Sequence, residues 1–266
     1  MQCPICDTST EVFGSACVLG RFDAQYRRCP SCGYLFVVDP LWMEQAYASA
    51  ITESDVGLVE RNLWLARLAG SVVQVMFDPN GRFIDYGGGT GLFTRLMRDK
   101  GFDWYWFDTA CRNVFATGFE ADMGDGTSYE LLTAAELFEH LIDPVETMSR
   151  LRSLSTNILF TTRLLPAPPP HLGEWWYYGL EHGQHVSFYT RRSLHLLGEK
   201  FGLRLASNGE NLHLFSTKRV PDIALRLVAS SAFYSFFSTV MSRRSLLPDD
   251  FEKARSAERN KDAHRA

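Results

Sequence analysis

The sequence has no excess of positive charge and no obvious export signal. Its 27 Lys and Arg stand against 31 Asp and Glu, which gives a net charge of -4 at pH 7. Because nucleic-acid binders usually carry a basic excess, a polyanion is not favoured as the main partner. The N-terminus, MQCPICDTST, lacks a basic segment followed by an apolar run, so we expect no secretory signal and a cytoplasmic location.

Long apolar runs are also missing. The most membrane-like stretch, 223–241, carries Arg226 and several serines, and arginine is costly at a bilayer centre. We therefore expect no transmembrane segment. A helix that packs on the protein, or that makes peripheral contact with a membrane surface, is expected at 223–241.

Cysteine is scarce, but four of the six cysteines fall in two C-x2-C pairs. Cys3 and Cys6 form one pair, and Cys29 and Cys32 form the other, followed by Gly33. This is zinc-ribbon spacing, in which two tight turns together offer four thiolates to a tetrahedral Zn²⁺. Four thiolates leave no open position, so the predicted zinc is structural. Two disulfides or four free thiols are the alternatives. The intervening residues can hold a hairpin.

After residue 40 the apolar periodicity predicts helices and strands in alternation. Helices are expected at 41–50, 59–76, 92–100, 144–152 and 191–201, and strands at 82–86, 104–108, 130–135, 158–162, 203–208 and 211–218. Such alternation favours an α/β fold with a largely parallel sheet covered by helices on both faces. We predict a zinc-ribbon segment at 1–39, a main domain at 40–220, and a C-terminal helix and charged tail at 221–266. The tail after Pro248 is expected to be frayed or disordered.

A glycine-rich run, DYGGGTG, follows the predicted strand 82–86. It does not match the dinucleotide fingerprint G-x-G-x-x-G, because the sixth position counted from Gly87 is Leu92, and it lacks the lysine of a phosphate loop. It fits D-x-G-x-G-x-G through Asp85, Gly87, Gly89 and Gly91. Such a loop lets the backbone approach a flat, polar ligand at the carboxyl end of a strand.

In these residues the chain resembles the class I S-adenosylmethionine (SAM)-dependent methyltransferases, over roughly 42–218. DYGGGTG is similar to the family's first motif, whose glycine loop passes under the methionine part of the cofactor. Asp108 ends the second predicted strand, where the family keeps a carboxylate for the ribose hydroxyls. The runs LLTAAELFEHLIDP (131–144) and HVSFYTRRSLHLLGEKFGL (185–203) resemble two segments of the methyltransferase-23-like subgroup.

The resemblance implies a Rossmann-like, mostly parallel seven-stranded sheet behind the four-cysteine zinc ribbon, and SAM as cofactor. The chain between 108 and 129 is short for the family, so the third strand is expected to be compressed and the adenine contact to lie near Phe119 and Glu120. The implied cofactor-binding residues are Asp85, Gly87, Gly89, Gly91, Asp108, Glu120 and Glu136.

Methyl transfer to a hydroxyl or a carbon acid needs a base, and histidine titrates near neutrality. Glu181 and His182 lie in the run LEHGQHVSF, which the resemblance places in a loop over the pocket. We predict His182 as the base, with Glu181 orienting it and His185 as the second candidate. His185 can equally be a structural histidine. His140 can act directly or fix the turn after the fourth strand.

The predicted function is therefore SAM-dependent methylation of a small metabolite, a sugar or nucleotide sugar of polysaccharide or secondary-metabolite biosynthesis. Four aromatics at 175–178 can stack on a sugar or can straddle core and surface. The alternatives are an RNA or protein methyltransferase that uses the ribbon for recognition, and a non-catalytic SAM-binding module. The ribbon holds three arginines against four acidic residues, which is not a basic patch.

Overall fold

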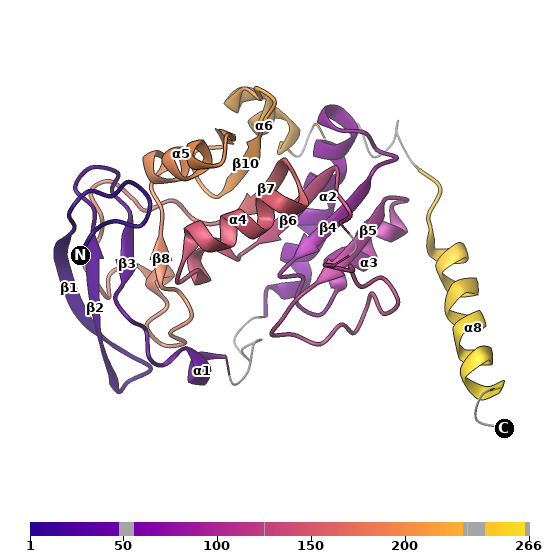
Figure 1. Cartoon of the computed structure of the whole chain (residues 1–266), viewed down its shortest axis with the longest axis horizontal. Coiled ribbons are helices and arrows are strands. Elements are labelled where there is room, and N and C mark those ends of the chain that lie inside the picture. Colours follow the sequence, from indigo (N-terminus) through magenta and orange to yellow (C-terminus); the bar gives the residue numbers. More distant parts are fainter. Residues whose placement is uncertain (48–55, 125, 231–232, 234–242, 264–266) are drawn as a thin grey trace. The chain divides into compact units, whose positions relative to one another are not determined.

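The computed structural model describes residues 1–47, 56–124, 126–230, 233 and 243–263 (Figure 1). These residues form two compact units. The first contains Met1–Val56 and Leu132–Arg226, and the second contains Gly57–Leu131 and Leu227–Ala266. The cysteine-rich segment therefore shares a unit with the later half of the α/β region. The boundaries predicted at 1–39, 40–220 and 221–266 stay a prediction.

The first unit begins with a small antiparallel sheet. Strands β1 (Glu11–Val18) and β2 (Phe22–Arg28) form the predicted hairpin, with a bulge between Val12 and Gly14. Strand β3 (Leu35–Val37) pairs with β2 and, on its other side, with the two-residue strand β8 (Ser187–Phe188). The sheet therefore joins the N-terminal segment to a strand far along the chain (Figure 1).

The same unit holds an α/β layer. Strands β6 (Leu131–Ala135) and β7 (Asn157–Thr161) are parallel, and β10 (Leu212–Ser216) runs antiparallel to β7 and to β9 (Arg204–Ser207). Asp143 caps the α-helix that follows β6, and Thr190 with Ser193 forms a capping box. The helices are α1 (Met43–Ala46), η1 (Phe138–His140), α4 (Pro144–Leu154), η2 (Trp176–Tyr178), α5 (Arg191–Lys200) and α6 (Asp222–Val228).

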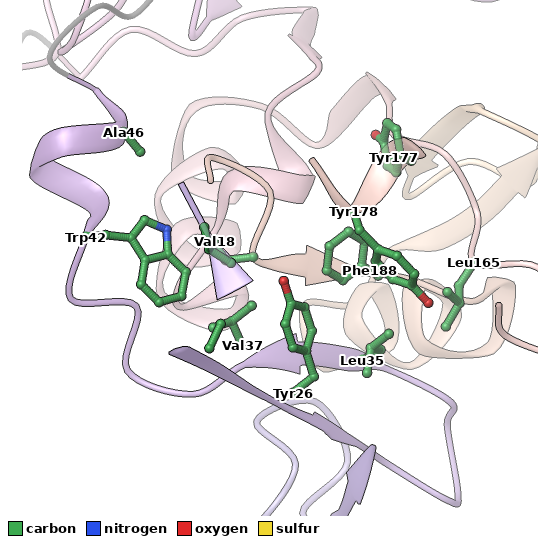
Figure 2. Close-up of a cluster of buried hydrophobic side chains, with 12 residues drawn as sticks. Val18, Tyr26, Leu35, Val37, Trp42, Ala46, Leu165, Tyr177, Tyr178 and Phe188 are labelled. Atoms are coloured by element: carbon green, nitrogen blue, oxygen red, sulfur yellow. The ribbon is translucent and has the colours of Figure 1, made fainter. Parts of the chain in front are cut away.

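One hydrophobic cluster joins the N-terminal residues 18–46 to residues 165–188 of the same unit (Figure 2). Tyr26 and Leu35 come from the small antiparallel sheet, and Tyr178 and Phe188 come from the later segment. Tyr178 packs edge-on against Phe188, with ring centroids 5.1 Å apart. Because this cluster is shared, neither part buries its apolar face alone.

The second unit contains a βαβ arrangement. Helix α2 (Leu58–Met76) precedes β4 (Arg82–Tyr86), which pairs in parallel with β5 (Asp103–Phe107) across helix α3 (Leu92–Asp99). The rings of Phe83 and Trp104 stack at 4.7 Å in its core, and Phe93 meets Trp104 edge-on. The glycine run connects β4 to α3, as the sequence predicted.

The α/β class is confirmed, but the predicted sheet is corrected. The α/β strands of the described chain are six rather than seven, and β9 and β10 make antiparallel pairs. The third strand is reduced to a single parallel bridge between Trp106 and Glu120. The short connection between 108 and 129 explains this, since too few residues remain to form a longer ladder.

The prediction of a frayed tail is wrong for 248–263, which belong to helix α8 (Leu247–Ala263). Asp250, 7% exposed, accepts two hydrogen bonds of 2.8 Å from the guanidinium of Arg98. Arg95 lies 2.9 Å from the same carboxylate. The high charge of the tail suggested solvation, but one buried carboxylate fixes the first turn of this helix.

Across the described ranges, no helix is both long and apolar enough to span a bilayer. The segment 223–241 was predicted to pack or to contact a membrane. Residues 223–228 belong to α6, whereas 231–232 and 234–241 lie outside the described residues.

Replacing Asp250 should destabilise the second unit. Asp250→Asn removes the carboxylate that Arg95 and the buried Arg98 share and leaves Arg98 paired with Asp103 alone, so we expect the free energy of unfolding to fall by about 2 kcal/mol. Asp249→Asn is the matched control, because Asp249 forms an exposed pair with Arg244 and should cost under about 1 kcal/mol. Denaturant titration of both variants checks this. Equal losses would show that the Arg98–Asp250 pair does not anchor α8.

Candidate functional site

The glycine run of the second unit has a backbone that only glycine adopts easily. Gly87, Gly89 and Gly91 have φ angles of +74°, +54° and +84°. A Cβ at Gly91 would lie 2.5 Å from the Asn113 side chain, and one at Gly88 would lie 2.6 Å from Trp106. By contrast, nothing lies within 4 Å of the Cβ position of Gly89. The loop is therefore packed from one side and open at Gly89, which suits a ligand that approaches the backbone.

Two carboxylates flank this loop. Asp85 is buried at the end of β4, and its Oδ2 would lie 2.8 Å from a Cβ at Gly88. Asp108 accepts the Gly89 N–H at 2.8 Å through Oδ2, while its Oδ1 accepts the N–H groups of Ala110 and Cys111. The structure thus brings Asp85, Asp108 and the glycines together.

The predicted adenine side is divided between a buried and an exposed residue. Phe119 is only 6% exposed, with the Arg98 guanidinium 3.6 Å and the Lys253 ammonium 4.4 Å from its ring centre. Glu120 is exposed and accepts hydrogen bonds from Asn113 and the Gly118 N–H. Glu120 is therefore the accessible member of this pair.

The four predicted cysteines gather in the first unit. Their sulfurs lie within 4.8 Å of one another, with 3.6 Å between Cys3 and Cys32 and 3.4 Å between Cys6 and Cys29. These separations are far longer than the ~2.05 Å of a disulfide and close to the ~3.8 Å edge of a tetrahedral zinc–thiolate site. A hydrogen bond from Cys32 lowers the pKa of the Cys3 thiol to about 5.

The histidine loop, defined as residues 179–186, is tied to the N-terminal segment. Trp42 donates from its indole to the Gly183 carbonyl at 2.8 Å, and the Gln184 side chain donates to the Ala46 carbonyl at 2.8 Å. The Val37 N–H donates to the Val186 carbonyl at 2.9 Å. Residues 37–46 therefore help to shape the loop that carries three predicted catalytic residues, Glu181, His182 and His185.

Three histidines meet in the first unit. The ring centres of His140 and His185 lie 5.0 Å apart, and those of His182 and His185 lie 4.7 Å apart. His140 follows β6 in η1, and the Val186 N–H donates to the carbonyl of the adjacent Glu139 at 2.8 Å. We name His140, His182, His185 and Glu139 the histidine cluster.

Hydrogen bonds decide which histidine nitrogens carry lone pairs. Nδ1 of His185 lies 2.7 Å from the Tyr177 carbonyl oxygen, which can only accept, so Nδ1 holds the proton and Nε2 the lone pair. Nδ1 of His182 accepts the Gln184 N–H at 3.1 Å, so neutral His182 carries its proton on Nε2. In these neutral forms Nε2 carries a lone pair in His185 and a proton in His182.

Burial controls the charge of this cluster. It lowers the pKa of His185 to about 4 and lowers the pKa values of His140 and His182. Burial, together with the charge of Glu136, raises the pKa of Glu139. Glu181 is exposed, and its charge only partly opposes the lowering at His182. Burial therefore favours the uncharged form of His140, His182 and His185.

Glu136 belongs to the first unit, unlike the other predicted cofactor residues. It ends β6 with a φ of +49°, which is unusual for a residue with a side chain. Thr161 accepts the Glu136 N–H at 2.9 Å and donates to its carboxylate at 2.6 Å. The neighbouring strand thus holds this strained turn in place.

Sequence reasoning assigned no role to Glu139 or Tyr47, and it treated Tyr177 only as one of four consecutive aromatics. The Tyr47 hydroxyl lies 2.8 Å from Nδ1 of His140, and the Tyr177 ring centre lies 4.7 Å from that of His185. Glu139 had a local signal, since it precedes His140 in FEHL. No local signal marks Tyr47, because its contact with His140 joins residues 93 positions apart in the sequence. The aromatic run straddles core and surface, with Tyr177 buried and Trp176 71% exposed.

An α/β fold with a glycine loop and a carboxylate at the end of the next strand defines a nucleotide-type cofactor binder. A family model described as a methyltransferase domain matches residues 62–208, which is more than half of the chain. The chain therefore belongs to this methyltransferase family, and the predicted resemblance is confirmed.

Solved structures of methyltransferases are similar at low identity. CalO1, a methyltransferase in calicheamicin biosynthesis solved with SAH bound, is 16% identical with a TM-score of 0.46, over 66% of this chain and 61% of that one. Human N-acetylserotonin methyltransferase in complex with SAM is 15% identical with a TM-score of 0.41, over 67% and 66%. The chain thus spans less than two thirds of the length of either protein. None of the curated proteins matches it.

Proposed function

We propose that the protein transfers a methyl group from SAM to a small metabolite. The observation that carries this proposal is the glycine loop, open at Gly89 and hydrogen-bonded there to Asp108. Asp85, Gly87, Gly89, Gly91, Asp108 and Glu120 would hold the cofactor. SAM supplies an electrophilic methyl group on a sulfonium. The protein's own part is to align the acceptor and exclude water.

A sugar or nucleotide sugar is the proposed acceptor. Trp176 is 71% exposed, and the Arg163 guanidinium lies 5.6 Å from its ring centre. An exposed indole beside a guanidinium can stack on a sugar ring and pair with a phosphate. An RNA acceptor is less well supported, because the ribbon has no basic excess.

Asp108→Ala should weaken SAM binding. It would leave the ribose hydroxyls without their acceptor, at a cost of about 2 kcal/mol, or roughly thirtyfold in Kd. Asp122→Ala is the control, since this exposed loop residue accepts only the Gly124 N–H among its described bonds. Calorimetry with SAM measures both. Unchanged affinity in Asp108→Ala, or no affinity in the wild type, would contradict the proposed site.

We propose further that the acceptor is activated at the histidine cluster and that activation depends on the Nε2 lone pair of His185. His182 can orient the acceptor by donating from Nε2, with Glu181 beside it in sequence. His140 completes the cluster through its contact with His185. This assignment follows from the hydrogen bonds of the two imidazoles at Nδ1.

His185→Ala should lower the single-turnover rate by roughly a hundredfold or more while SAM affinity stays nearly constant. His182→Ala, its matched control, should have a smaller effect, because its lone pair already accepts a backbone N–H. The assay uses an acceptor found by screening nucleotide sugars for methyl transfer. A larger rate loss in His182→Ala than in His185→Ala would reverse the assignment.

The four cysteines are proposed to bind one structural zinc ion. Their sulfur separations and knuckle turns fit the ion, and each knuckle ends in a residue with positive φ, Asp7 at +58° and Gly33 at +76°. No substrate position remains on such a site. Its role would be to hold the N-terminal segment against the histidine loop.

Cys32→Ser should remove about one equivalent of zinc per chain relative to the wild type. Because the cysteine segment contacts the histidine loop, the variant should also melt at a lower temperature and lose more turnover than SAM affinity. Cys17→Ser, an exposed cysteine outside the cluster, should change none of these. Metal analysis and thermal melting test this. A Cys32→Ser protein with wild-type zinc content would exclude the site.

A further inference from the structure

The Glu139 carboxylate is a buried polar group that lacks a hydrogen-bond partner. Its residue is 0% exposed, and neither carboxylate oxygen has a partner among the residues that the structure describes. Burying such a group without a partner costs about 1–3 kcal/mol when it is neutral and far more when it is ionised, so native proteins almost always satisfy it. A binding partner from outside the chain would remove this cost.

Two histidines offer nitrogen atoms beside this carboxylate. One ligand atom from each of Glu139, His140 and His185 lies within 4.8 Å of the other two. The Tyr177 carbonyl holds Nδ1 of His185, and the Tyr47 hydroxyl contacts Nδ1 of His140. This is how metal-binding histidines are normally oriented, with one nitrogen fixed by a hydrogen bond and the other directed at the metal.

We propose that Glu139, His140 and His185 bind a divalent transition-metal ion such as Zn²⁺, at a site separate from the four cysteines. Two imidazoles and one carboxylate form a donor set suited to Zn²⁺ or Fe²⁺, and they leave coordination positions open. Ligand atoms in a tetrahedral zinc site lie about 3.3 Å apart, so side-chain shifts of up to ~1.5 Å would close this set. The ion's charge would compensate the buried carboxylate.

His182 is not part of the proposed ligand set. Its Nδ1 accepts the Gln184 N–H, and its Nε2 carries the proton, so neutral His182 has no free lone pair. It can instead donate a hydrogen bond to a group bound at an open position of the metal. The cluster thus provides three ligands and one donor.

A catalytic use of this ion rests on the proposed function, whereas its binding does not. A hydroxyl group that coordinates a divalent cation ionises more readily, as metal-bound water does. The ion would then activate the acceptor, and His185 would act as a ligand that holds the ion in place.

Metal content of the full-length chain tests the site directly. Wild type, Glu139→Gln and His185→Asn are each equilibrated with Zn²⁺, or with Mn²⁺ or Fe²⁺ without oxygen, then desalted and analysed for metal. For at least one of these metals, both variants should bind about one equivalent per chain less than the wild type does. His195→Ala is the control, because His195 is exposed on α5 and pairs with Glu199. The cysteines are intact in every chain, so their zinc cancels in the comparison.

Equal metal content in the wild type and both variants would overturn the proposal. If Glu139→Gln fails to fold, as judged by thermal melting, His140→Asn and His185→Asn decide the question in the same way. A His185 variant that loses turnover but no metal would leave the proposed function standing and reject the metal site. If the wild type transfers no methyl group but the variants still hold less metal than it does, the metal site stands and the proposed function is rejected.

Discussion

Strand β3 is the constraint on which the first unit depends, because it connects the cysteine cluster to the histidine loop. Leu35 pairs with Phe188 in antiparallel register, and the Thr190 hydroxyl donates to the Cys32 carbonyl at 2.6 Å. The hydroxyls of Tyr34 and Ser187 lie 2.6 Å apart, across 153 positions of sequence. A change in the cysteine turns would therefore be transmitted to β8 through a few short contacts. The hydrophobic cluster of Figure 2 spans the same junction.

This junction bears on the role of the N-terminal segment. A module that reads a macromolecule needs a free surface of suitable charge, whereas this segment buries Tyr26, Val37 and Trp42 within its own unit. The indole of Trp42 is also bonded to the histidine loop. These contacts favour a scaffold role, in which the segment fixes the histidine loop. They do not favour a ribbon that reads RNA or protein. A zinc ion suits the scaffold role, since it would order a segment too small to form its own core.

Features encoded by neighbouring residues could be predicted from sequence, and features made by distant contacts could not. The strand 82–86, the glycine loop and the two cysteine turns each follow from local spacing, and all were predicted. The pairing of β3 with β8 has no local signal. The tail was mispredicted because its charge suggested solvation, although a single carboxylate, Asp250, is buried against Arg98. Which imidazole nitrogen of His182 and of His185 carries the proton depends on the atoms that face each Nδ1, and only the folded chain determines these contacts.

The turn after β6 concentrates the departures from low-energy structure. Glu136 takes a left-handed conformation, and three residues later Glu139 buries an unpartnered carboxylate beside two neutral histidines. Strain of this kind costs about 1–3 kcal/mol per residue and persists only where the surroundings enforce it. Here Thr161 on β7 and Val186 beside β8 supply that enforcement through hydrogen bonds. Asp7, Leu19 and Asp39 also take positive φ angles, but among the described residues only the turn after β6 combines such a residue with a buried carboxylate that lacks a hydrogen bond, and this combination directs attention to that turn.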